Sequence, residues 1–136
     1  MKENAKKYYL DQDFNCAETV LRLANDRFAL NIGEDDLKLV SGFGGGMGCE
    51  KTCGALCAGL AAISKAVVTG RAHATENFKE ICSNYVSKFE ETLGSISCAE
   101  LREKYVTEEF RCIETVERSA ELLESYLNEL LSKESK

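Results

Sequence analysis

The sequence predicts an all-α fold, a single helical domain over residues 1–136. Three observations lead to this prediction. Apolar residues recur at the 3.6-residue period of a helix in four long segments, and no segment alternates polar and apolar residues for long enough to form a strand. The length of 136 residues also suits one domain with its own core. We therefore expect a bundle of about four main helices plus short helices.

The first main helix is expected from residue 16 to about residue 30. Asn15 and Glu18 have the spacing of a capping box, in which the Asn side chain accepts a free backbone N–H and the Glu side chain reaches back. An apolar stripe follows this signal at helical spacing. Short helices are expected on either side of this helix, over residues 2–10 and 34–40.

Two further main helices are expected in the middle of the chain. The second begins after Thr52, which we interpret as its cap, and ends at Gly70. Its small residues, as in CGALCAGLAA, predict a thin central helix that other helices approach closely. The third begins at Thr75, carries an apolar face, and stops at Gly94.

The last part of the chain predicts a short helix followed by a long one. Ser97 and Glu100 form a second capping-box pattern, which opens a helix over residues 98–104. The final helix is expected over residues 107–131, with its apolar residues on one face.

Composition limits the function of this domain. The formal net charge is −6, and 29% of the residues are charged, so nucleic-acid binding, which needs Lys and Arg against phosphates, is not expected. No apolar run approaches the roughly 20 residues that cross a bilayer, so membrane insertion is not expected either. The charged N-terminus lacks the apolar core of a secretory signal. We therefore expect a cytoplasmic protein.

Cysteine usage points to chemistry rather than to structural disulfides. The chain has seven cysteines, an odd number, and a reducing compartment favours metal binding or redox chemistry for such residues. Some of them are expected to be small buried apolar residues instead. The only histidine, His73, lies in a polar stretch and is expected to be exposed, so the chain has little material for a histidine-rich metal site.

Four cysteines lie near the starts of predicted helices. Cys16, Cys53 and Cys98 each follow an expected cap, and Cys112 falls in the first or second turn of the last helix. Free N–H groups and the helix dipole favour a thiolate at a helix start, so we expect a lowered pKa for Cys16, Cys53 and Cys98. The alternative is that cysteine is simply a small residue that a buried helix start accepts.

A glycine-rich loop, GFGGGMG, precedes the second main helix. We expect Gly44, Gly45, Gly46 and Cys49 to form one wall of the site, where a small ligand, a partner or a cluster approaches the backbone beside Cys53. Their N–H groups are expected to stabilise negative charge on the Cys53 sulfur. A nucleotide cradle is not expected, because no strand precedes the loop and no lysine has the spacing of a P-loop.

Three cysteines fall outside this pattern of helix starts. Cys49 and Cys57 lie one turn before and after Cys53, and Cys49 is the better candidate for an additional member of the site. Cys57 is deeper in the helix and is expected to pack. Cys82 lies within the apolar stripe of the third main helix and is expected to belong to the core.

Four motifs, in order, resemble those of the C_GCAxxG_C_C family of redox-active proteins. They are NCAETVL, GFGGGMG followed by CGAL, LGSISCAEL, and RCIETV. The resemblance covers nearly the whole chain, and by position it carries the family cysteines onto Cys16, Cys53, Cys98 and Cys112. Ala58 stands where the family pattern has glycine, with Gly59 following. The resemblance implies a small helical protein with a redox role, associated with transport functions in some members, and it supplies no established reaction.

The predicted catalytic or metal-binding residues are therefore Cys16, Cys53, Cys98 and Cys112, which should meet at one end of the bundle. They would form a dithiol–disulfide centre, or they would ligate an iron–sulfur cluster or a tetrahedral zinc ion. The spacing does not decide between these alternatives. The rival hypothesis is a non-catalytic helical module for binding or oligomerisation, with buried inert cysteines. The redox partner, the small molecule bound and the oligomeric state, homodimer included, stay open.

Overall fold

The computed structural model describes residues 1–134 and confirms the all-α fold. Across this range there are two isolated β-bridges and no strand. The α-helices are α1 (Cys16–Phe28), α2 (Glu34–Leu37), α3 (Gly54–Val67), α4 (Phe78–Leu93), α5 (Cys98–Tyr105) and α6 (Ile113–Glu134). Shorter helical turns cover Lys2–Asn4, Lys7–Asp11, Lys38–Phe43, Gly46–Glu50 and Ala72–Ala74. In the described part of the chain, no helix combines the length and the apolar character that crossing a membrane would need.

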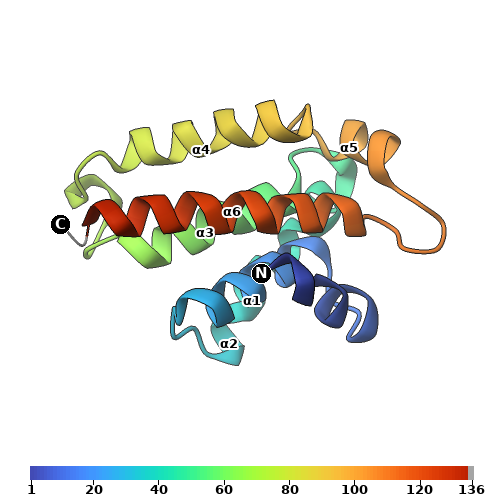
Figure 1. Cartoon of the computed structure of the whole chain (residues 1–136), viewed down its shortest axis with the longest axis horizontal. Helices are drawn as coiled ribbons and strands as arrows, with labels where there is room; N and C mark the ends of the chain where they lie inside the picture. The colour runs from blue at the N-terminus through green and yellow to red at the C-terminus, as the bar shows by residue number, and fades with distance from the viewer. Residues whose placement is uncertain (135–136) are drawn as a thin grey trace.

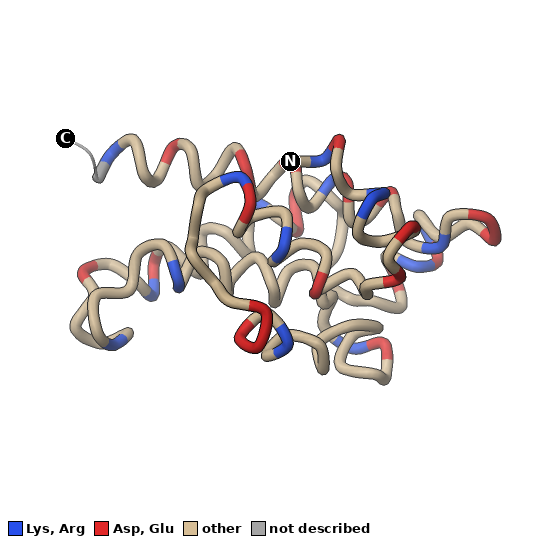
Figure 2. The backbone as a smooth tube through the Cα atoms, turned by 90° about the horizontal axis from the view of Figure 1, so that it is seen from below, with Lys and Arg blue, Asp and Glu red and all other residues tan. Residues whose placement is uncertain are grey.

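Helix α3 is the centre of the bundle, as its small residues predict. It packs against α1, α4 and α6, and Figure 1 shows α4 and α6 running alongside it with α1 and α2 on the other side. Helix α5 and the loop before α3 gather at one end of the bundle. Acidic and basic residues are interspersed over most of the described chain (Figure 2), whereas residues 39–64 contain only Glu50 and Lys51 as charged residues.

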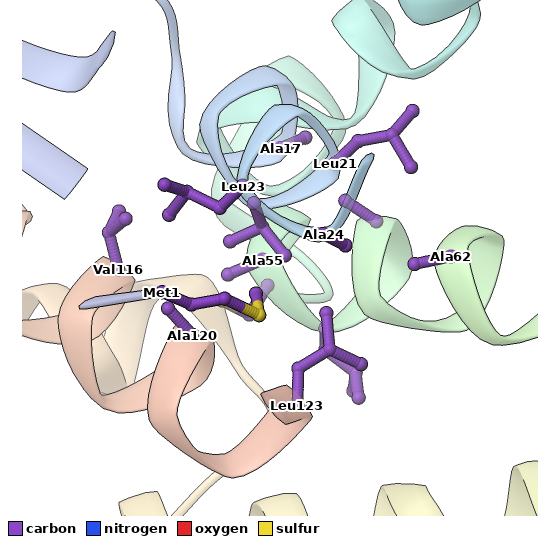
Figure 3. Packing of buried hydrophobic residues seen from close by; sticks show 14 of the residues in the cluster. Met1, Ala17, Leu21, Leu23, Ala24, Ala55, Ala62, Val116, Ala120 and Leu123 are labelled. Carbon is purple, nitrogen blue, oxygen red and sulfur yellow. The ribbon is translucent and has the colours of Figure 1, made fainter. Parts of the chain in front are cut away.

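Small side chains in the core let α1, α3 and α6 approach one another. Ala24 of α1, Ala55 and Ala62 of α3, and Ala120 of α6 are fully buried. Figure 3 shows them interleaved with larger apolar side chains, among which is Met1 at the chain start. Burial of apolar area here is the main favourable contribution to the folding free energy.

The two predicted capping boxes differ in how far they form. At α1 the box is complete: the Glu18 N–H donates to Asn15 Oδ1, and the Asn15 N–H donates to Glu18 Oε1, both at 3.0 Å. At α5 the Glu100 N–H donates to Ser97 Oγ at 3.4 Å. The Glu100 carboxylate does not reach back to Ser97, because it accepts a hydrogen bond from Ser95 Oγ. Only half of the second box is therefore present.

Two helix starts lie elsewhere than predicted. The N-cap of α3 is Cys53 itself, because Thr52 pairs with Ser97 in an antiparallel bridge. The last helix begins at Ile113 rather than at residue 107, because Thr107 and Arg111 exchange two backbone hydrogen bonds of 3.0 and 2.9 Å and close a turn. Cys112 therefore directly precedes α6, where its carbonyl accepts the N–H of Val116 at 3.1 Å.

Candidate functional site

A cavity of about 100 Å³ lies at the end of the bundle where α1, α3, α5 and α6 begin. Four different helix starts each contribute one cysteine to it, so Cys16, Cys53, Cys98 and Cys112 come together although they are far apart in the sequence. The other lining residues are Tyr9, Asn15, Gly45, Gly54, Leu101, Arg102, Arg111 and Thr115.

The bridge between Thr52 and Ser97 fastens the start of α3 to the start of α5. The Cys53 N–H donates to the Ile96 carbonyl at 2.8 Å, and the Cys98 N–H donates to the Lys51 carbonyl at 2.6 Å. These two bonds fix the backbone of both cysteines. Cys53 and Cys98 therefore reach the cavity from two adjacent, hydrogen-bonded segments.

Gly54 brings the start of α1 against the start of α3. A Cβ atom at this position would lie 2.4 Å from the Phe43 carbonyl oxygen and 3.0 Å from Cys16 Sγ. No side chain fits in that space. The Cys16 sulfur therefore lies against the backbone of the residue that follows Cys53.

Cys112 is held by the N-terminal segment. Its backbone N–H donates to the Tyr9 hydroxyl at 3.2 Å. The neighbouring Arg111 donates from Nη2 to the Tyr9 carbonyl at 2.8 Å, and its guanidinium lies 4.6 Å from the centre of the Tyr9 ring. The turn before α6 is thus anchored to residues more than a hundred positions earlier.

The glycine loop does form part of the cavity wall, through one residue. Gly45 lines the cavity, whereas Gly44 packs on Asn15 and Gly46 packs on Cys98, with no room for a Cβ atom at either position. Among the groups that act on the pKa of Cys16, the Gly45 N–H lowers it against the effect of burial, whereas the N–H groups that lower the pKa of Cys53 are those of Leu56 and Ala55. The expectation that the loop N–H groups stabilise negative charge on Cys53 stays a prediction.

Burial, rather than the helix starts, governs the buried thiols, so the expected lowering of their pKa is wrong. Cys53 is 4% exposed, and burial raises its pKa to about 12, although the N–H groups of Leu56 and Ala55 oppose the shift. Burial also raises the pKa of Cys16, against the N–H of Gly45, with a further increase from the charge of Cys112.

Cys98 follows the same rule. Burial raises its pKa, negative charge on Cys16 and Cys112 adds to the shift, and the Arg102 guanidinium opposes it. The desolvation of a thiolate outweighs the N–H groups at Cys16 and Cys53, and the Arg102 guanidinium at Cys98.

Two arginines line the mouth of the cavity, and sequence reasoning missed both. Arg102 donates from Nη1 to Cys112 Sγ at 3.7 Å and pairs from Nε with Glu50 at 3.0 Å. Arg111 pairs with Asp13 at 3.3 Å. Both arginines are exposed, while Cys112 is half-buried. The adjacency of Arg111 to Cys112 in the sequence could have indicated Arg111, whereas no comparable signal marks Arg102.

One polar group in the cavity lacks a partner. Thr115 is 4% exposed, and its Oγ1 is buried without a hydrogen bond to any residue in the described range 1–134. Thr115 lies three residues after Cys112, in the first turn of α6. It could therefore be predicted as a site residue only if the start of that helix were known.

The remaining cysteines lie outside the cavity. Cys49 is exposed, and its Sγ donates to the Gly46 carbonyl at 3.7 Å. Cys57 is half-buried one turn into α3, where burial and negative charge on Cys16 raise its pKa. Cys82 is also half-buried, in an open surface groove that His73 shares, so it is not a fully buried core residue. His73 is exposed, as expected.

The cavity does not present a ready-made set of metal ligands. Among residues 1–134, no group of three or more His, Cys, Asp or Glu side chains is arranged to hold a metal ion. The four cysteines line one cavity. The assignment of Cys16, Cys53, Cys98 and Cys112 as ligands of zinc or of an iron–sulfur cluster therefore stays a prediction.

Comparison with known proteins gives one match. The family model described as "Putative redox-active protein (C_GCAxxG_C_C)" matches residues 14–126, a segment that contains all four cavity cysteines. No curated protein and no solved structure matches the chain.

Proposed function

This chain belongs to the C_GCAxxG_C_C family, and on that premise we propose that its cysteine cavity is a centre for thiol–disulfide exchange. The observation that carries this proposal is the meeting of four thiols from four helix starts in one small cavity with two arginines at its mouth. Thiols that exchange through mixed disulfides must be close to one another and open to a substrate. The cavity supports both conditions.

Cys112 is the attacking thiol in this proposal. It is half-buried at the mouth, and the Arg102 guanidinium donates a hydrogen bond to its sulfur. Cys16 is the resolving thiol. Negative charge on Cys112 raises the pKa of Cys16, after burial and against the Gly45 N–H, so the two sulfurs interact electrostatically. The Gly45 N–H is placed to stabilise negative charge on Cys16 as it reacts.

The exchange takes two steps and needs a disulfide as the oxidant. The Cys112 thiolate attacks a substrate R–S–S–R, the S–S bond breaks, a mixed disulfide Cys112–S–S–R forms, and RS⁻ leaves and takes a proton. The Cys16 thiolate then attacks the Cys112 sulfur, releases the second RS⁻, and leaves a Cys16–Cys112 disulfide. Two electrons pass from the two protein thiols to the substrate, and two protons follow them. The reverse sequence reduces the protein.

Cys53 and Cys98 form an inner pair that exchanges more slowly. Both are buried, and burial raises the pKa of each. Negative charge on Cys16 contributes to both shifts, so Cys16 is the thiol through which the inner pair would receive a disulfide.

The test is to oxidise the fully reduced protein with a small disulfide, quench by alkylation, and map the cysteines by peptide mass spectrometry. We expect a Cys16–Cys112 disulfide to form first. Cys16→Ser should trap the mixed disulfide on Cys112, and Cys112→Ser should prevent its formation. Cys82→Ser, outside the cavity, serves as the matched control and should behave as the wild type. Seven freely alkylated cysteines after oxidation would refute the exchange centre.

A second candidate is the non-catalytic helical module with inert cysteines. The burial of Cys53 and Cys98, and the raised pKa of Cys16, Cys53 and Cys98, favour it. The same experiment separates the two functions, because inert thiols would neither trap a mixed disulfide nor form a native disulfide.

Metal content is measured separately. The exchange as proposed uses only thiols and a disulfide, and no step of it involves a metal. Elemental analysis and a visible spectrum of protein purified without oxygen test this point. About one metal ion or cluster per chain, lost on Cys16→Ser, would replace the exchange centre with a metal centre.

A further inference from the structure

The mouth of the cavity carries two pairs of opposite charge. Arg102 pairs with Glu50, and Arg111 pairs with Asp13. All four side chains are exposed. Exposed ion pairs of this kind contribute little to stability. A ligand with charges of both signs can therefore replace the partner of each arginine and of each carboxylate at a small cost in free energy. A ligand of a single sign would be attracted by one member of each pair and repelled by the other.

The cavity itself is small. Its volume of about 100 Å³ compares with about 30 Å³ for one water molecule in the liquid. It therefore admits a few non-hydrogen atoms, such as the C–S–S end of a small disulfide, and the rest of the ligand must lie on the mouth.

Arg102 connects the charged mouth to the reacting thiol. It donates to Cys112 Sγ while it pairs with Glu50. A carboxylate bound by Arg102 would therefore hold a nearby S–S bond of the same molecule against Cys112. The binding group and the reacting bond must be close together in the ligand.

We infer that the substrate of the exchange centre is a small disulfide with α-amino acid ends, of which cystine is the simplest. Each end carries a carboxylate for an arginine, an ammonium group for Glu50 or Asp13, and a sulfur a short distance away. This inference rests on the proposed function and names its substrate class. In the first step the S–S bond of cystine breaks, one half stays on Cys112 as a mixed disulfide, and the other leaves as a cysteine thiolate that takes a proton. Cys16 then releases the second half.

The experiment compares four disulfides as oxidants of the reduced protein. They are cystine (zwitterionic ends), dithiodipropionate (anionic), cystamine (cationic) and bis(2-hydroxyethyl) disulfide (neutral). Each rate of Cys16–Cys112 disulfide formation is divided by the rate of the same oxidant with N-acetylcysteine, which removes the intrinsic reactivity of the disulfide. We expect the normalised rate for cystine to exceed that of the neutral probe by about tenfold, the effect of one favourable charged contact.

Variants of the mouth separate binding from reactivity. In Arg102→Gln and Arg111→Gln the ratio of the cystine rate to the neutral rate should fall severalfold, while Arg102→Lys should recover part of it. Glu50→Gln leaves the contact between Arg102 and Cys112 in place. It removes a negative charge from the mouth, so the normalised rate of the anionic probe should rise relative to that of cystine. Arg71→Gln, an exposed arginine beyond the other end of α3, is the matched control and should keep the wild-type ratio.

The outcomes distinguish this inference from the function on which it rests. Equal normalised rates for cystine and the neutral probe, or an unchanged ratio in both Arg102→Gln and Arg111→Gln, would overturn the substrate class and leave the exchange centre intact. No disulfide with any of the four probes would overturn both.

Discussion

The two ends of the bundle place cysteines in opposite surroundings. At one end, four cysteines stand at or just before helix starts that hydrogen bonds tie together, among them the Thr52–Ser97 bridge. At the other end, Cys82 lies inside α4 and faces an open groove. That helix begins after Asn77, whose side chain makes no capping hydrogen bond. The difference teaches that packing around a helix start decides the pKa of a thiol there: burial raises the pKa of Cys53 more than the N–H groups of Leu56 and Ala55 lower it.

The largest expected difference between the two ends is in thiol reactivity. With its pKa raised to about 12 by burial, Cys53 at pH 8 should be alkylated on the order of a thousandfold more slowly than an unhindered cysteine of ordinary pKa. Cys82, half-buried beside an open groove, should react much faster than Cys53. Iodoacetamide labelling of the folded protein, followed by peptide mapping over time, measures both rates. Rates within tenfold of each other would show that the two ends do not differ as described.

Packing at the cysteine end should tolerate substitution least. Gly54→Ala would place a Cβ atom 2.4 Å from the Phe43 carbonyl oxygen and 3.0 Å from Cys16 Sγ. The backbone cannot yield, so we expect a loss of about 3 kcal/mol in the free energy of unfolding. Urea denaturation measures it. Gly33→Ala, which meets nothing within 4 Å, is the control and should cost far less. Similar losses in both variants would contradict the close approach at Gly54.

Alkaline pH should lower the free energy of unfolding through the buried thiol of Cys53. The folded-state pKa of Cys53 is about 12 against an ordinary value of 9.0, so the folded protein holds this proton over a range in which the unfolded chain releases it. The stability from this group is fully present below pH 9 and is lost as the pH rises toward 12, with a limiting slope of about 1.4 kcal/mol per pH unit. Urea denaturation at several pH values should show this slope. Burial also raises the pKa of Cys16 and Cys98, so Cys53→Ala should reduce the slope by up to about this amount without removing it. Cys82→Ala, at a more open position, should change the slope less.

The smallest effects concern the helix caps. Asn15→Ala removes the complete capping box of α1 and the hydrogen bond from Asn15 Nδ2 to the Ser41 carbonyl, so we expect a loss of about 1–2 kcal/mol. Asn77→Gly at the start of α4 removes no capping bond and relieves a left-handed backbone, with φ at 58°, so its effect should stay within about 0.5 kcal/mol. Thermal unfolding of both variants tests the contrast, and a loss at Asn77 as large as that at Asn15 would contradict it.

The sequence predicts the helices well and the site only in part. Apolar periodicity and the Asn15–Glu18 box place α1 correctly, because both signals are local. The start of α6 is missed because a turn closed by Thr107 and Arg111, and anchored on Tyr9, depends on contacts that no local pattern reveals. The convergence of the four cysteines follows from the family motifs. Arg102 and Thr115 could not be predicted as site residues, because nothing local distinguishes them from other polar residues on helices. The pKa of Cys53 could not be predicted either, because it depends on burial that only the packed helices define.

The cysteines of the cavity come from both ends of the polypeptide, and this has a consequence for chain topology. In the proposed oxidised state, a disulfide between Cys16 and Cys112 would close a loop that contains most of the molecule. Closing a loop of roughly 100 residues restricts the unfolded ensemble by about 4–5 kcal/mol in the chain-entropy description. The oxidation state of one pair of sulfurs would then set the free energy of unfolding of the whole bundle. This free energy would be highest when the protein carries the disulfide and lowest after the disulfide has been reduced.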